Sequence, residues 1–159
     1  MNFYRIIIIT FLIINNVYIA QDGWEHQWWG TPEFLGVSAS SDSIAWYVGD
    51  ANMAIRVTPD YKYWYQIGDE PFITLTAVYT PLGSMGETCF IGSADGSIYR
   101  ISDFDFWEEV YAYDGDGYGF INGVHFFDEN NGVALGDPPL WMDGYSEYLI
   151  LTTNDGGNN

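Results

Sequence analysis

The chain repeats itself at an offset of 43 residues, and this repeat restricts its fold more than any other sequence feature. Residues 48–64 align without a gap with residues 91–107. Backbone geometry and packing tolerate least change at turn residues and large rings, so matches there predict two copies of one structural unit. Such matches are Gly49 with Gly92, Asp60 with Asp103, and Trp64 with Trp107.

A third copy follows the first two and contains an insertion. Residues 133–137 align with residues 46–50, and residues 148–155 align with residues 53–60. The intervening residues 138–147 are longer than their counterparts, so we expect them to form a surface loop. The units are therefore expected at about residues 34–68, 72–113 and 120–159.

Each unit is predicted to contain four short strands separated by turn residues such as those at 50–52 and 94–96. Residues 44–48 are apolar at consecutive positions, which predicts burial on both faces, as when small sheets stack. Four strands in a repeat of about 40 residues are typical of a β-propeller blade. The expected fold class is all-β: an incomplete β-propeller of about three four-stranded antiparallel blades, the third of them truncated.

Two segments are expected before the first unit. Residues 1–20 combine Arg5, an apolar run and Ala20 before Gln21, the pattern of a secretory signal peptide. The apolar run is shorter than the roughly 20 residues that span a bilayer. We therefore expect a propeller domain at 21–159 with no transmembrane segment after signal cleavage, secreted or at the cell surface, with the periplasm as an alternative. Residues Trp24–Trp29 are predicted to form a lone outer strand that completes a final blade of a longer chain.

Charge and composition exclude several classes of protein. The chain has 4 Lys+Arg against 22 Asp+Glu, a net charge of −18, which repels phosphate backbones and argues against nucleic acid as a partner. Aromatic residues make up 19% of the chain, which favours a packed domain over disorder. Cys89 is the only cysteine, so we expect no internal disulfide and a buried, inert thiol.

Residues 153–159 (TNDGGNN) resemble the Asp-box of sialidase-type (BNR) propellers, in which a Ser or Thr, an Asp and a Gly at alternate positions precede an aromatic residue. Residues 126–138 are similar to a strand-turn-strand of secreted BNR/YCF48-like repeat proteins. The resemblance implies a turn whose Asp caps backbone N–H groups, with a ring packed between blades. The first two units lack the box glycine, and their assignment depends on the internal repeat. The predicted structural Asp-box residues are Thr153, Asp155, Gly157, Asp60, Asp103, Trp64 and Trp107.

The resemblance to sialidases raises the question of glycoside hydrolysis. Sialidases hold a substrate carboxylate with three arginines, whereas only Arg56 and Arg100 follow the predicted signal. A glycosidase that uses two carboxylates is harder to exclude. Asp50 and Asp137 occupy equivalent positions after a glycine at the end of a second strand, although a turn or surface role is the simpler interpretation.

The sequence predicts neither a metal site nor a cofactor. Asp114 and Asp116 are spaced carboxylates in a Gly-rich segment, but the later Glu of an EF-hand loop is missing, so a solvated turn is favoured. His26 and His125 stand alone, without the second His or Cys that a zinc site needs.

Exposed aromatic residues are the remaining binding signal. Trp141 and Tyr145 lie in the inserted loop, where a ring can stack on a sugar or anchor a protein. The possible ligand-facing residues are therefore Asp50, Asp137, Trp141 and Tyr145. We expect a binding or scaffold module for an unknown protein or glycan ligand rather than an enzyme. The alternatives are a polysaccharide-active glycoside hydrolase of sialidase-like fold and a YCF48-like assembly factor for a membrane complex.

Overall fold

A computed structural model describes residues 33–68, 72–103, 106–114, 119–128, 130–137 and 148–158, and the statements below concern these residues. They form eleven strands and no helix, hence no helix that could cross a membrane. The strands are β1 (Phe34–Ala39), β2 (Ala45–Gly49), β3 (Met53–Val57), β4 (Lys62–Gln66), β5 (Leu75–Tyr79), β6 (Cys89–Ser93), β7 (Ile98–Ser102), β8 (Phe106–Tyr111), β9 (Phe120–Phe126), β10 (Gly132–Asp137) and β11 (Leu149–Thr153).

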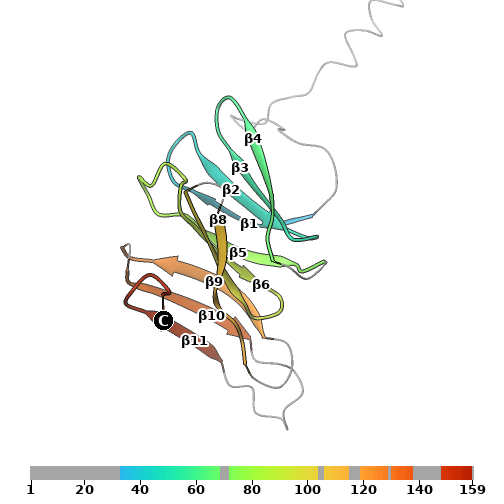
Figure 1. Cartoon of the computed structure of the whole chain (residues 1–159), viewed down its shortest axis with the longest axis vertical. Helices are drawn as coiled ribbons and strands as arrows, with labels where there is room; N and C mark the ends of the chain where they lie inside the picture. The colour runs from blue at the N-terminus through green and yellow to red at the C-terminus, as the bar shows by residue number, and fades with distance from the viewer. Residues whose placement is uncertain are drawn as a thin grey trace, which may run out of the picture. The chain divides into compact units, whose positions relative to one another are not determined.

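The strands form three antiparallel sheets, here called blades 1, 2 and 3. Their strand orders are β1-β2-β3-β4, β5-β6-β7-β8 and β11-β10-β9. Neighbouring blades meet at their first strands, since β5 contacts both β1 and β9 (Figure 1). The predicted all-β, propeller-like fold class is thereby confirmed, with two four-stranded blades and a third blade that has three strands among the described residues.

Blade 2 is buried on both of its faces. All five residues of β6 are buried, as the consecutive apolar residues of such strands predict. The main core cluster joins blade 1 to blade 2 and includes Trp46, Val48, Leu75 and Ile91, each with no exposed surface. A smaller cluster around Ile121 joins blade 2 to blade 3. The core therefore lies between blades rather than within any one of them.

A β-bulge in the first strand of each blade sets the true register of the repeat. The extra residues are Leu35 in β1, Thr76 in β5 and Asn122 in β9, where the pairing with the second strand shifts. When the blades are aligned on these bulges, equivalent positions in the second and third strands of blades 1 and 2 are 44 residues apart, one more than in the sequence alignment. Arg56, opposite Trp46, is thus equivalent to Arg100, opposite Phe90.

The two aligned tryptophans occupy non-equivalent positions. Trp64 pairs with Ile55, whereas Trp107 pairs with Ile101. The physical reason is the hairpin length, because Val57 pairs with Lys62, whereas its equivalent Ile101 pairs with Trp107, one residue further along the chain. Trp64 is 45% exposed on β4. Trp107 is half-buried and packs edge-to-face on Tyr99, with ring centroids 5.9 Å apart, beside the main core cluster.

Asn52 fixes the passage of the chain from blade 1 to blade 2. It is fully buried at a φ of 60°, in the β2–β3 turn. Its side chain donates to the Ile67 carbonyl oxygen (2.8 Å) and accepts from the Ile73 N–H (2.7 Å). Its backbone N–H and carbonyl bond to the same two residues. One side chain therefore closes the linker between two blades.

We expect Asn52→Ala to lower the free energy of unfolding by about 2–3 kcal/mol, because it leaves a buried carbonyl and a buried N–H without their partners. Asn52→Gly removes the same bonds but accepts the positive φ, so it should cost less than the alanine variant. Urea unfolding followed by tryptophan fluorescence measures both. Wild-type midpoints for both variants would show that the linker does not depend on this side chain.

Candidate functional site

A groove of about 910 Å³ lies between blades 2 and 3. It opens at the edge of the sheets that carries the β1–β2, β5–β6 and β9–β10 connections, which we call the groove edge. The opposite edge carries the β2–β3 and β6–β7 turns and the linkers between blades, and we call it the linker edge. The β5–β6 loop forms one wall, and the turn from Phe127 to Asn131 forms the other. Phe90, Phe126 and Arg100 also line it.

The equivalent space between blades 1 and 2 is closed. There the Trp46 indole N–H donates to the Gly86 carbonyl oxygen (3.1 Å), and the Arg56 guanidinium donates to the Met85 carbonyl oxygen (2.9 Å). Both bonds hold the β5–β6 loop against blade 1. Phe90 stands at the position equivalent to Trp46 and has a smaller ring without a donor. The β9–β10 turn is short and closes on itself, with the Phe127 N–H bonded to the Asn131 carbonyl oxygen.

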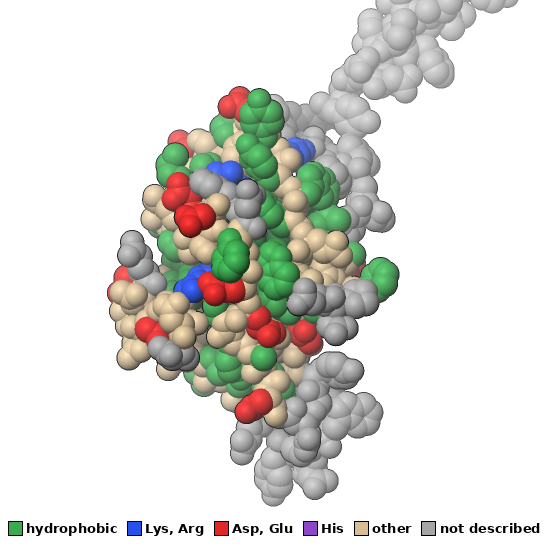
Figure 2. Space-filling model, in the orientation of Figure 1, with side chains coloured by type: hydrophobic (Ala, Val, Ile, Leu, Met, Phe, Trp, Pro, Cys, Tyr) green, Lys and Arg blue, Asp and Glu red, His purple; other side chains and the backbone are tan. Residues whose placement is uncertain are grey.

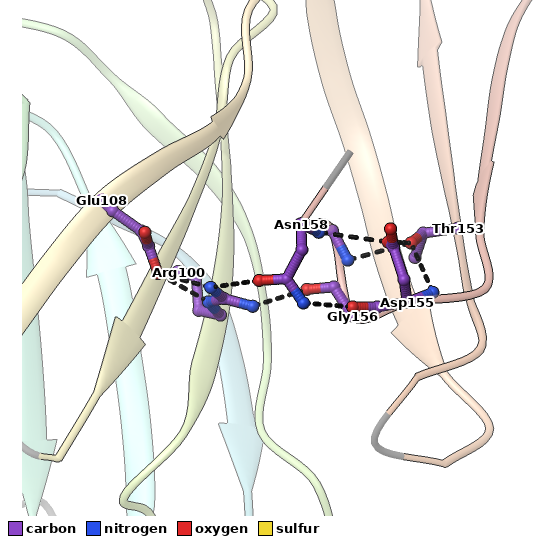
Figure 3. Close-up of polar contacts among 7 residues, drawn as sticks. Arg100, Glu108, Thr153, Asp155, Gly156 and Asn158 are labelled. Carbon is purple, nitrogen blue, oxygen red and sulfur yellow. Dashed lines mark hydrogen bonds and ion pairs between the residues drawn. The ribbon is translucent and has the colours of Figure 1, made fainter.

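Arg100 ties blade 2 to blade 3 beside the groove (Figure 3). Within its own blade, Nε and Nη2 donate to Glu108 Oε1 at 2.9 and 2.5 Å. Across the interface, Nη1 donates to the Gly156 carbonyl oxygen (2.8 Å) and Nη2 donates to Asn158 Oδ1 (2.9 Å). The Gly156 N–H in turn donates to the Asn130 carbonyl oxygen (2.9 Å). The guanidinium thus positions the turn that supports one wall of the groove.

The structure brings Thr153, Asp155 and Gly157 together in that turn, directly after β11. Thr153 Oγ1 accepts from the N–H groups of Asp155 (3.3 Å) and Gly157 (2.9 Å) and donates to Asp155 Oδ1 (2.8 Å). The Asn158 N–H donates to the same carboxylate oxygen (3.1 Å). Gly156 and Gly157 have φ values of 75° and 79°, which glycine adopts without strain.

Asp60 and Asp103 lie in the corresponding turns of blades 1 and 2, and both are exposed. In blade 1 the turn is held by Thr58, whose Oγ1 accepts from the Tyr61 N–H (3.1 Å) while its N–H donates to the Tyr61 carbonyl oxygen. Thr58 therefore has a role in this turn that sequence reasoning missed. In blade 2, Asp103 has a φ of 50°.

The residues expected to face a ligand lie at the linker edge or outside the described residues. Asp50 follows β2, where its Oδ1 accepts from the Thr74 hydroxyl (3.1 Å) and so ties the β2–β3 turn to blade 2. Asp137 is exposed at the end of β10. Trp141 and Tyr145 are outside the described residues, as are Asp116, the predicted signal at 1–20 and the strand expected at Trp24–Trp29.

Aromatic rings that sequence reasoning passed over line the groove and continue from its rim. The Phe90 and Phe126 rings stack with centroids 3.7 Å apart, and the Tyr79 hydroxyl donates to the Phe126 carbonyl oxygen (2.6 Å). The His125 ring lies edge-on to the rings of Tyr79 and Phe127, with centroids 4.7 and 5.2 Å apart. Phe127 is 70% exposed. The signal was the pair of consecutive rings at 126 and 127, because neighbouring side chains at the end of a strand point in opposite directions, so that both rings are rarely buried together.

The stacked pair of Phe90 and Phe126 also lines a second, apolar cavity of about 360 Å³. This cavity lies between blades 2 and 3, where Val110, Val124 and Leu151 surround it. The two rings therefore lie between the polar groove and an apolar space in the same interface.

Among the described residues that line the groove, Asp128 is the carboxylate, and its own turn keeps it ionised. The N–H groups of Asn131 and Asn130 donate to Oδ1 at 2.8 and 2.9 Å, and the Asn131 side chain donates to both carboxylate oxygens. These bonds, that of the Asn131 N–H foremost, lower the pKa of Asp128 below its usual 3.8. A general acid needs a pKa raised towards neutrality, so this shift has the wrong sign for proton donation.

Other reactive groups lie away from the groove or do not cluster. Burial raises the pKa of the Cys89 thiol well above its usual value, which keeps the thiol protonated. Within the part of the chain that the structure describes, no three His, Cys, Asp or Glu side chains gather where they could hold a metal ion. The groove is thus lined by rings, hydroxyls, amides and the aliphatic Pro81 and Leu82, together with Asp128 and the paired Arg100.

Comparison with models of known protein families and with curated proteins finds no match to this chain. The resemblance of residues 153–159 to an Asp-box therefore rests on the residues themselves and on the turn that they form. Function has to be inferred from the chemistry of the groove.

We expect Arg100→Met to loosen the turn after β11, because the variant keeps the aliphatic stem but loses every donor to Gly156 and Asn158. Hydrogen exchange of the Gly156 and Asn158 amides should accelerate. Stability should fall by about 1–2 kcal/mol, a modest loss since the side chain is partly solvated. Glu108→Gln, which leaves both interface bonds in place, is the matched control. Equal exchange in both variants would contradict the proposed tie.

The Asn130 and Asn131 amide resonances should titrate with Asp128 as the pH falls. Because the folded pKa is lowered, the carboxylate stabilises the turn above the unfolded pKa, and this contribution is lost as the pH falls through the folded value. NMR should therefore show a midpoint below 3.8. Asp128→Asn keeps an acceptor oxygen but cannot titrate, so its amide shifts should stay flat. A midpoint at or above the usual value would contradict the hydrogen-bonded geometry.

Proposed function

We propose that the protein is an exported propeller-type binding or scaffold module, and that the groove between blades 2 and 3 is its ligand-binding surface. The observation that supports this most is the difference between two equivalent interfaces. Trp46 and Arg56 close the first interface by their bonds to the β5–β6 loop. The second interface stays open although Arg100 occupies the position equivalent to Arg56. The propeller-like packing does not require such an opening, so we attribute it to function.

The lining of the groove suits recognition. Its volume of about 910 Å³ lies within the range of pockets that bind small molecules or short segments of larger ones. Phe127 offers an exposed ring of the kind that dominates binding energy at interfaces. Ser84, Asn130 and Asn131 add hydroxyl and amide groups that can fix the orientation of a ligand. The net charge of −18 favours neutral or cationic ligands over polyanions.

The same groups support binding over catalysis. A glycoside hydrolase with two carboxylates needs one of them protonated at working pH, and the pKa of Asp128 is shifted in the opposite direction. Arg100 is paired with Glu108 and with the turn after β11. The glycoside hydrolase and the membrane-complex assembly factor are thus the alternatives that the experiment below has to separate from a binding module.

We expect Phe127→Ala to weaken ligand binding at least tenfold, because it removes the exposed ring at the groove rim. The measurement is binding of the full chain to an array of neutral oligosaccharides and random octapeptides, followed by titration of the best probe. Phe72→Ala is the matched control, since Phe72 is 83% exposed but lies at the linker edge. Equal binding by wild type and Phe127→Ala would contradict the proposal. Release of free sugar from the array would favour the hydrolase, and co-purification of a membrane partner would favour the assembly factor.

A further inference from the structure

We propose that the ligand of the groove is an extended polypeptide segment that carries a basic residue beside an apolar or aromatic one. This inference rests on the proposed binding function of the groove and adds the class of ligand. Three features of the described residues support it: the apolar groups on the two walls, the charge of the groove, and the distribution of cations in the chain.

The two walls of the groove offer apolar contacts of different kinds. On the β9–β10 side, Phe127 is 70% exposed. On the β5–β6 side, Leu82 is 83% exposed and follows Pro81, so that wall is aliphatic. A sugar ring stacks on a flat aromatic face, whereas aliphatic groups pack best against the side chains of a peptide. A ligand that satisfies both walls therefore carries apolar side chains along an extended backbone.

The charge of the groove favours a basic residue in that peptide. Asp128 is exposed on the groove wall and is held ionised by the N–H groups of its own turn. Arg100, the cation of the groove, already faces Glu108 Oε1 at 2.5 Å, so their charges offset one another. The carboxylate of Asp128 thus gives the groove a net negative charge, which attracts an ammonium or guanidinium group of a ligand.

The rest of the chain strengthens the same preference. It carries 22 Asp+Glu against 4 Lys+Arg, and on the face drawn in Figure 2 acidic side chains are spread among hydrophobic ones while basic ones are few. Arg56 lies at the interface of blades 1 and 2, where it donates to Met85. The resulting negative electrostatic potential accelerates the association of cationic peptides and slows that of anionic peptides.

The test uses two fluorescein-labelled octapeptides, one alternating lysine with phenylalanine and one with glutamate in place of each lysine. Fluorescence anisotropy with the full chain should give at least tenfold tighter binding of the lysine peptide. Asp128→Asn, which keeps an acceptor for the turn, should weaken the lysine peptide about fivefold. Glu109→Gln removes one exposed charge from β8 and should change the affinity less than twofold. Raising the salt from about 50 to about 500 mM should reduce the difference between the two peptides.

The outcomes separate this inference from the proposed function. Equal binding of both peptides, or an unchanged affinity in Asp128→Asn, overturns the basic-peptide ligand. Even then, the groove remains a binding surface if Phe127→Ala weakens binding of either peptide or of a neutral oligosaccharide. If Phe127→Ala changes nothing for any probe, both proposals fail. Circular dichroism of each variant shows that the sheets are intact.

Discussion

The burial of blade 2 between its two neighbours is the constraint on which the remaining structure depends. Each of its faces carries apolar side chains, and β6 has no exposed residue at all. One small sheet cannot shield both of its own apolar faces from water, so blades 1 and 3 have to stack against it. The polar contacts then decide how the blades are oriented. Asn52 holds the linker into blade 2, and Arg100 holds the turn that follows β11.

The fold could be predicted from the sequence because its main signals are local. Consecutive apolar residues, turn residues and a repeat length identify strands and blades without any knowledge of contacts. The turn at Thr153, Asp155 and Gly157 was predictable for the same reason, since the hydrogen bonds among these three residues join positions at most four apart. Register is different. Leu35 and Thr76 are bulged, and the β3–β4 and β7–β8 hairpins differ in length, so an ungapped alignment paired Trp64 with Trp107 although they occupy different positions.

The groove could not be predicted for a related reason. It exists because Phe90 stands where blade 1 has Trp46. In the first interface the β5–β6 loop also covers Trp46, whereas in the second interface the β9–β10 turn leaves the space above Phe90 open. Both facts become visible only when the register is corrected by one residue. Two rings in succession at Phe126 and Phe127 were the sequence feature that pointed to an exposed aromatic group at the groove. Asp50 and Asp137, two of the residues expected to face a ligand, lie at the other edge of the sheets, and Asp50 has a structural bond there.

The joints between blades also bear on whether the blades are interchangeable modules. At the first joint the buried side chain of Asn52 fills the space; at the equivalent place in blade 2 stands Gly96, where a Cβ would lie 2.8 Å from the Cβ of Tyr113. A turn transplanted from blade 1 into blade 2 would thus collide with the following linker, and the reverse exchange would leave a hole. The two turns are therefore not interchangeable, and each blade is fitted to its own place in the chain by the residue at its joint.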